Sequence, residues 1–183
     1  MRVLGIDQSL TSTGLVVLQD LELVAYKVVA SKLFGAARID DIRRQTLAFH
    51  KEHGVDHWAL EGYSYKSPNG MAQSGELGGM LRLQHLMTFK AEILVVAPST
   101  RMKYATGKGS VDKDIILGYC LKKWGVDFLD EKGANDLADA YVIARVATHF
   151  FRLKGGLPIE NEKLLSYERD AVLALLAPPK KKG

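Results

Sequence analysis

Residues 2–30 read RVLGIDQSLTSTGLVVLQDLELVAYKVVA and contain three apolar stretches separated by two polar ones. The stretches at 2–6, 13–18 and 23–30 alternate or run apolar, with Val, Leu and Tyr. The separators SLTST and QDLE have the composition of turns. The pattern therefore predicts a three-stranded antiparallel meander, with Asp7 at its first turn.

Beyond residue 30 the sequence alternates between two kinds of pattern. Apolar residues at helical spacing predict helices, and short apolar runs predict buried strands. Three strands, followed by helices that alternate with two further strands, imply an α/β fold with one mixed sheet and helices on its faces. The predicted helices span 36–53, 71–90, 112–124 and 160–177, with another in NDLADAYVIARVA at 135–147, and the two further strands span 57–60 and 92–96.

The size and composition favour a single domain. The chain has 183 residues, of which 47% are hydrophobic and 25% charged, an ordinary composition for a soluble protein. No apolar run approaches the roughly 20 residues of a membrane span, and Met1 leads directly into a strand, so we expect a cytoplasmic protein without a membrane partner. We expect a domain at 1–155, a C-terminal helix at 156–177 and a disordered basic tail at 178–183.

The net charge and the cysteine content indicate which partner and which kind of metal site to expect. The net charge of +4 and the pI near 9.1 favour a polyanionic partner. The single cysteine, Cys120, excludes an intrachain disulfide and a cysteine-rich zinc site, and its apolar helical setting predicts a packed small hydrophobe. The five histidines show no shared ligand spacing. Any metal site is therefore expected to rest on carboxylates.

Four acidic residues occupy otherwise apolar surroundings. Asp7 closes VLGID, Glu61 closes WALE, and Asp136 and Asp139 lie within an apolar helical run. An acid at a strand end is often only a turn former or a cap. Two buried strands, however, would deliver Asp7 and Glu61 to one end of a sheet, where ligands gather in α/β folds. The three-residue spacing puts Asp136 and Asp139 on one helical face, where a cation between them would offset their repulsion.

Carboxylates gathered in this way suit hydrolysis of a phosphodiester assisted by Mg²⁺. Two such ions, about 3.5–4 Å apart, stabilise the attacking and the leaving oxygen, and Mg²⁺ prefers hard oxygen ligands. We expect Asp7 to bridge the two ions, Glu61 to bind one and Asp139 the other, with Asp136 completing or orienting the set. Mn²⁺ is expected to substitute for Mg²⁺.

A basic, glycine-containing segment follows the last predicted strand. Gly107 and Gly109 would let backbone amides and cations approach a phosphate, although a plain basic loop is an equal alternative. The spacing does not match a phosphate-binding P-loop, so no nucleotide cofactor is expected. Tyr63 and Tyr65, in a loop after Glu61, could stack on a base or cover a core edge. The cations of the basic segment are Arg101, Lys103, Lys108 and Lys113.

The stretches VLGIDQSLTSTG, LEGY, APSTRMKYATGKGSVDK and NDLADAYVIA occur in this order. Together they resemble the RuvC family of Holliday junction resolvases, within the ribonuclease H-like superfamily, from residue 1 to about residue 150. The resemblance implies a five-stranded mixed sheet flanked by helices, a homodimer, and Mg²⁺-dependent nicking of two opposed strands at a four-way DNA junction. It carries the family's catalytic acids over to Asp7, Glu61, Asp136 and Asp139, and its basic residue after the glycine pair to Lys113.

The chain departs from the family pattern at four points, of which two are the early position of Glu61 and the Lys-rich end. Ser64 stands near the place of the family's junction-probing aromatic residue, with Tyr63 and Tyr65 on either side, and Lys103 is only an approximate counterpart of the family's upstream lysine. These departures favour a phage or divergent member that also accepts forks or flaps. A nuclease for RNA–DNA hybrid and a junction-binding protein without catalysis remain alternatives. An actin-like ATPase would need two such domains, more than 183 residues supply.

Overall fold

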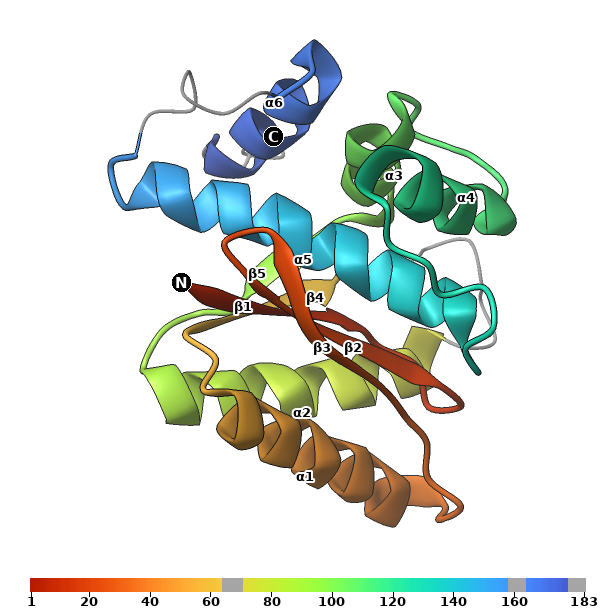
Figure 1. Cartoon of the computed structure of the whole chain (residues 1–183). Helices are drawn as coiled ribbons and strands as arrows, with labels where there is room; N and C mark the ends of the chain where they lie inside the picture. Colours follow the sequence, from red (N-terminus) through yellow and green to blue (C-terminus); the bar gives the residue numbers. More distant parts are fainter. Residues whose placement is uncertain (64–70, 158–163, 178–183) are drawn as a thin grey trace, which may run out of the picture.

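The computed structural model describes residues 1–63, 71–157 and 164–177 (Figure 1). Its five strands form one mixed sheet in the order β3-β2-β1-β4-β5, in which β1 to β3 make an antiparallel meander and β4 and β5 run parallel to β1. The predicted α/β fold with one mixed sheet is confirmed. The strands are β1 (Arg2–Asp7), β2 (Thr13–Gln19), β3 (Glu22–Val29), β4 (His57–Glu61) and β5 (Leu94–Val96).

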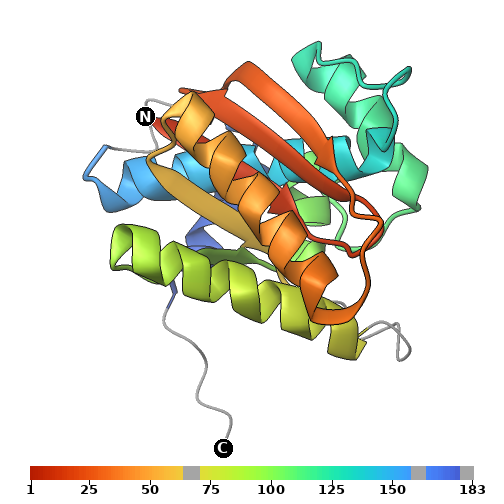
Figure 2. The ribbon, with the colours of Figure 1, turned by 90° about the horizontal axis from the view of Figure 1, so that it is seen from below.

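Helices cover both faces of this sheet (Figures 1 and 2). One face carries α1 (Gly35–His53) and α2 (Met71–Phe89). The other carries α5 (Ala134–Lys154), which crosses β1 and β2, with the remaining helices packed around it. These are α3 (Pro98–Thr106), α4 (Lys113–Trp124) and α6 (Ser166–Leu176). Strands β1, β2 and β4 are thus buried on both sides, as their nearly continuous apolar sequences require, whereas the edge strand β3 is largely exposed.

The two-residue period of the strands decides which side chains face α5. In β1, Val3 belongs to the core on the α5 side, whereas Leu4 and Ile6 belong to the core on the side of α1 and α2. In β4, Ala59 faces α5 and Leu60 faces away from it. Because successive side chains alternate between faces, the final residues of both strands are directed to the face that α5 covers. Asp7 and Glu61 are these final residues.

Two glycines allow α5 to lie unusually close to the sheet. A Cβ atom on Gly5 would come within 2.1 Å of the backbone oxygen of Ala140, and one on Gly14 within 2.2 Å of the backbone oxygen of Asp136. Both clashes are with helix backbone, which has little freedom to move. Glycine is therefore required at these two points, and the close approach brings the acidic end of α5 to the ends of β1 and β2.

The segment after β5 differs from its prediction. We predicted a basic, glycine-containing segment there, with a plain basic loop as an equal alternative and no helix, but α3 spans Pro98–Thr106. Proline is favourable in the first turn of a helix, where its missing N–H has no partner to lose. Arg101, Tyr104 and Ala105 form the buried face of α3, and Gly107 ends it with a positive φ of 80°. The expected loop is confined to the residues that follow Gly107.

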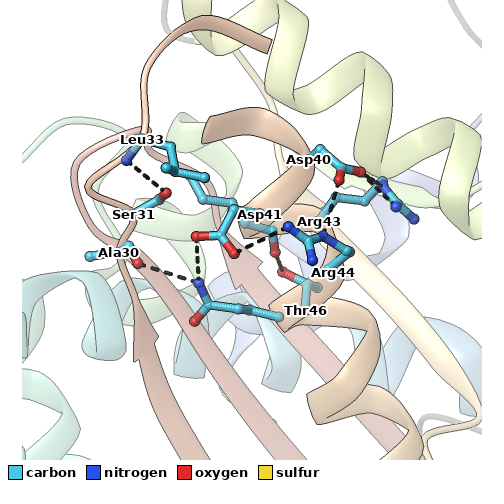
Figure 3. Close-up of polar contacts among 10 residues, drawn as sticks. Ala30, Ser31, Leu33, Asp40, Asp41, Arg43, Arg44 and Thr46 are labelled. Atoms are coloured by element: carbon cyan, nitrogen blue, oxygen red, sulfur yellow. Dashed lines mark hydrogen bonds and ion pairs between the residues drawn. The ribbon is translucent and has the colours of Figure 1, made fainter. Parts of the chain in front are cut away.

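The exposed face of α1 carries a cluster of arginine–aspartate pairs (Figure 3). Arg43 Nη2 lies 2.7 Å from Asp40 Oδ1, and Arg44 Nε lies 3.0 Å from Asp40 Oδ2. Arg44 also approaches Asp41, at 3.8 Å. Their three- and four-residue spacings place these side chains next to one another on one helical face. Asp40, Asp41, Arg43 and Arg44 form this α1 cluster, whose ion pairs are in contact with water.

The C-terminal part of the fold agrees with its prediction in kind and differs in extent. Within the described residues α6 begins at Ser166, later than the predicted 160, and residues 178–183 lie outside the described part. Cys120 is fully buried, as expected, and burial raises the pKa of its thiol to about 12. Across the described residues, none of the helices has both the length and the apolar character needed to cross a membrane.

Candidate active site

Three elements bring the four predicted acids to one end of the sheet. Asp7 ends β1, Glu61 ends the neighbouring parallel strand β4, and Asp136 and Asp139 lie in the first two turns of α5. Asp7 is the most enclosed of them, with only 8% of its surface exposed. The site therefore lies at the end of the sheet where the sequence predicted it, and α5 covers it.

A buried arginine joins two of these acids. Arg101 Nε lies 2.8 Å from Glu61 Oε1, and Arg101 Nη1 forms a close ion pair with Asp139 Oδ1. The exposed fractions of the three side chains are 9% for Arg101, 17% for Glu61 and 19% for Asp139. We predicted that Arg101 approaches a phosphate as part of a basic segment; in this structure α3 directs its guanidinium to two of the acids.

The electrostatics of Asp7 reflect its enclosure. Burial, followed by the negative charge of Glu61 and a hydrogen bond with it, raises the pKa of Asp7 well above its ordinary value. Arg101 acts in the opposite direction, and Asp136 adds a smaller upward contribution. The positive charge of Arg101 thus does not outweigh burial and the neighbouring acids. Asp7 resists ionisation in this arrangement, and a further cation would favour its charged form.

A residue of the β1–β2 turn fixes the position of Asp136. The hydroxyl of Ser12, in the turn between β1 and β2, donates a short hydrogen bond to Asp136 Oδ2. In the same turn, the Thr13 hydroxyl donates to the Ser9 carbonyl at 2.6 Å and accepts from the Ser9 backbone N–H at 3.2 Å. The turn is therefore ordered by its own hydroxyl groups, and it fixes one carboxylate oxygen of Asp136.

The donor set fits a hard divalent cation by its chemistry. All four acids offer carboxylate oxygens, which Mg²⁺ prefers. Among the described residues, however, no three His, Cys, Asp or Glu side chains converge closely enough to surround a metal ion. Arg101 explains this spacing in part, because its guanidinium lies between Glu61 and Asp139. The ligands that Mg²⁺ needs are present at one end of the sheet, with an arginine among them.

The residues predicted to bind phosphate differ in exposure. Lys108 and Gly109 are exposed, in the short loop after α3, and the Lys108 backbone N–H donates to Thr106 Oγ1 at 3.1 Å. Lys103 is partly exposed and lies 3.6 Å from Asp170 of α6. Gly107 faces the ring of Tyr167, also from α6. Lys113 begins α4, and its side chain lies outside the described part.

Of the two tyrosines predicted to stack on bases, the structure describes only Tyr63. Tyr63 is half-buried, its hydroxyl donates to the Gly75 carbonyl at 3.4 Å, and the guanidinium of Arg82 lies 5.1 Å from its ring centroid. In this structure Tyr63 packs against α2, which corresponds to the alternative in which it covers a core edge. Tyr65 and Ser64 lie outside the described residues.

Sequence reasoning missed three contributors to the site. Gly5 and Gly14 admit α5, and Ser12 holds Asp136. A glycine within an otherwise apolar strand is a known sign of close backbone approach, so Gly5 could have been noticed. Ser12 gave no signal, because the contact spans 124 residues of sequence.

Comparison with solved structures identifies the fold. The chain is similar to Thermus thermophilus RuvC, with a TM-score of 0.66 and 24% identity over 86% of this chain and 98% of that one. It is similar to a T. thermophilus RuvC in complex with Holliday junction substrate, with a TM-score of 0.65 and 24% identity over 86% and 97% of the chains. A complex of Fowlpox virus resolvase with Holliday junction DNA gives 0.55 and 13% over 82% and 99%.

No protein-family model matches the sequence, and no curated protein matches it significantly. The structural similarity covers most of this chain and nearly all of each solved protein, so it concerns the whole domain. The chain therefore has the ribonuclease H-like α/β fold of these resolvases. The fold that the four sequence motifs implied is confirmed.

Proposed function

We propose that this protein is a metal-dependent endonuclease that nicks branched DNA, with the four-way junction as its substrate. One observation carries the proposal: β1, β4 and α5 bring four carboxylates to one end of a sheet whose fold is that of Holliday junction resolvases. Two of the similar structures hold junction DNA, which supports branched DNA as the partner. A cytoplasmic location remains part of the prediction.

In the proposed site, Asp7 is the shared ligand of two Mg²⁺ ions, with Glu61 and Asp139 as the ligands of one ion each. Asp136 completes or orients the set, and the Ser12 hydroxyl limits its rotation. Bound Mg²⁺ supplies activation of water and stabilisation of the leaving oxygen. Asp7 has to be ionised to act as a ligand. Because burial and Glu61 raise its pKa, metal binding and deprotonation of Asp7 are expected to occur together.

The exposed loop after α3 is the proposed contact for the DNA backbone. Its Lys108 offers a positive charge in contact with water, and Gly109 leaves its backbone open to a close approach. Lys103 can contribute if it leaves Asp170. We retain Lys113 as the basic residue of the reaction, on the strength of the sequence resemblance alone.

A homodimer is the second part of the proposal. Successive turns of α2 expose large apolar side chains, Met80, Leu83 and Met87, which are 36%, 49% and 62% exposed. Their spacing of three and four residues puts them on one stripe of the helix. A pair of such stripes related by a two-fold axis would bury them and present two active sites to a symmetric junction. A Leu83→Glu protein is expected to be monomeric by light scattering at a concentration where the wild type is dimeric.

The direct test is to map nicks on a synthetic four-way junction in Mg²⁺ and in Mn²⁺. We expect paired nicks in opposed strands, and none with Asp7→Asn or Asp139→Asn. A plain duplex, a fork, a flap and an RNA–DNA hybrid of equal length serve as competitors, since they separate a junction resolvase from a broader branched-DNA nuclease and from a hybrid nuclease. Equal cleavage of the plain duplex would contradict structure selectivity.

A junction-binding protein without catalysis is the second candidate. The ion pairs of Arg101 favour it, because they engage Glu61 and Asp139 in contacts that compete with metal coordination. Under this alternative the junction is bound tightly and stays intact in both metals. A gel-shift measurement and a cleavage assay on the same samples distinguish the two functions.

A further inference from the structure

Arg101 reaches the site from an element that carries none of the acids. Glu61 belongs to β4 and Asp139 to α5, whereas Arg101 lies in the first turn of α3, three residues after Pro98. The guanidinium contacts Glu61 through Nε, at 2.8 Å, and Asp139 through Nη1. One side chain of α3 therefore links two carboxylates that belong to two other elements.

The site needs a positive charge even before any ligand binds. Asp7, Glu61 and Asp139 lie at one end of the sheet and are each less than one-fifth exposed, so these like charges repel one another in partly enclosed surroundings. Ionised groups removed from water are stable only when paired. Arginine suits this role because its guanidinium is always charged and offers several donors in a fixed plane. Arg101 is thus the cation that the structure pairs with the two acids.

The same carboxylate oxygens cannot serve Arg101 and a metal ion to the full extent. Mg²⁺ takes its ligands at about 2.0–2.1 Å, and Glu61 Oε1 and Asp139 Oδ1 both engage the guanidinium. A metal ion that enters between these acids has to replace those contacts, since two cations cannot share the space. Occupation by one is linked to departure of the other.

We propose that Arg101 is an internal counter-cation that holds Glu61 and Asp139 in the metal-free protein and releases them when a divalent ion binds. Metal binding is then an exchange of one cation for another, and the intrinsic affinity of the acids for metal is reduced by the strength of the Arg101 contacts. This inference rests on the metal site of the proposed function. It adds a positioning residue that keeps the carboxylates in place until the metal arrives.

The alternative role for Arg101 is a permanent strut between α3 and the sheet. A strut stays in place when metal binds, and its loss then weakens both the fold and the metal site. An exchanging cation gives the opposite sign for metal affinity, because its removal frees the two acids. The sign of the change in affinity therefore separates the two roles.

The experiment is a titration of the purified full chain with Mn²⁺, followed by electron paramagnetic resonance and calorimetry, without DNA. It compares wild type, Arg101→Met, Arg101→Lys and Arg44→Met, the last being a matched change on α1. We expect Arg101→Met to bind Mn²⁺ at least about tenfold more tightly than wild type, which corresponds to about 1.4 kcal/mol. Arg101→Lys should fall between them, and Arg44→Met should equal wild type.

Equal or weaker binding by Arg101→Met overturns the exchange and leaves the metal site of the proposed function intact. Absence of Mn²⁺ binding in wild type and all variants overturns both. If Arg101→Met is unfolded without metal, circular dichroism should show that Mn²⁺ restores its helices. A chain that stays unfolded at saturating Mn²⁺, together with Arg101→Lys binding no more tightly than wild type, also overturns the exchange.

Discussion

Two arginine–carboxylate clusters in this molecule have nearly the same contact geometry and opposite surroundings. In the α1 cluster Arg43 and Arg44 lie 2.7 and 3.0 Å from the oxygens of Asp40, which is 47% exposed (Figure 3). At the candidate active site Arg101 lies 2.8 Å from Glu61, and both side chains are less than one-fifth exposed. Distance alone would rank the two clusters as equals.

The pKa values of their acids separate the two clusters. A hydrogen bond from Arg43 lowers the pKa of Asp40, with a smaller opposing effect from burial. Burial and Glu61 raise the pKa of Asp7, although Arg101 opposes them. On the surface, water already stabilises an ionised carboxylate, and the arginine adds to that stabilisation. In the site, the arginine has to compensate for the lost hydration and for the repulsion by neighbouring acids. The surroundings determine whether the positive charge of an arginine outweighs the other effects on the pKa of a nearby acid.

The largest expected effect is on catalysis, at Asp7. Asp7→Asn keeps the side-chain volume and removes the charge, so we expect the rate of junction cleavage in Mg²⁺ to fall by about 10³-fold or more. Asp40→Asn, the matched change in the α1 cluster, should leave the rate unchanged. Single-turnover cleavage of a labelled junction measures both. A rate for Asp7→Asn within tenfold of wild type would show that the charge of Asp7 is not required for cleavage.

The next effect is on stability, at Arg101. In metal-free buffer Arg101→Met leaves Glu61 and Asp139 without their cation, which should lower the free energy of unfolding by about 3 kcal/mol. For a chain of this size the melting temperature should fall by about 6–12 °C. Urea unfolding in EDTA, followed by circular dichroism, measures the change. A loss no greater than that of Arg44→Met would show that burial does not strengthen this cluster.

A second buried ion pair, with one carboxylate in place of two, tests whether the number of paired acids sets the size of the effect. Lys123 of α4 lies 2.8 Å from Glu168 of α6, with exposed fractions of 18% and 5%, and it also donates to the Tyr167 hydroxyl at 3.1 Å. Lys123→Met should lower the free energy of unfolding by about 2 kcal/mol. Limited proteolysis near α6 should accelerate at the same time, because Lys123 ties α6 to α4. An unchanged rate of proteolysis would show that the lost stability does not come from the contact between α4 and α6.

The pH dependence of stability should have opposite signs in the two clusters. The raised pKa of folded Asp7 means that its contribution is fully present below the ordinary value of 3.8 and is lost as pH rises through the folded pKa. The stability of wild type relative to Asp7→Asn should therefore decrease with rising pH. Asp40 has a lowered pKa, so its contribution is present above 3.8 and lost on acidification. Melting curves in EDTA from pH 3 to pH 7 compare each variant with wild type, and slopes of the same sign would contradict this account.

The smallest effect is expected on α1 itself. Arg44 is 60% exposed and pairs with acids three and four residues away. Exposed pairs of this kind contribute little and are screened by salt. Arg44→Met should lower the melting temperature by less than about 2 °C, and the difference should vanish in 1 M salt. A larger drop that persists in salt would mean that the aliphatic part of Arg44, rather than its charge, stabilises α1.

Prediction from sequence succeeded where a local pattern was strong. The alternation in residues 2–30 predicts the meander that β1 to β3 form, and the apolar spacing of α1 predicts its position to within a residue. The prediction failed after β5, because Pro98 reads as a break although it is also favourable in a first helical turn. Nothing in the local sequence pattern therefore indicated that Arg101 contacts Glu61 and Asp139.

The sequence by itself determined the acids and the ends of the sheet to which they belong. Asp7 and Glu61 follow apolar strands whose period fixes the face of each side chain, and Asp136 and Asp139 share a helical face by their spacing. Only the tertiary structure decided which groups meet these acids. Ser12 and Arg101 reach them across long stretches of chain, and α5 approaches because Gly5 and Gly14 lack side chains. Periodicity is a local property that sequence carries, whereas burial and the pairing of charges depend on the packing of distant segments.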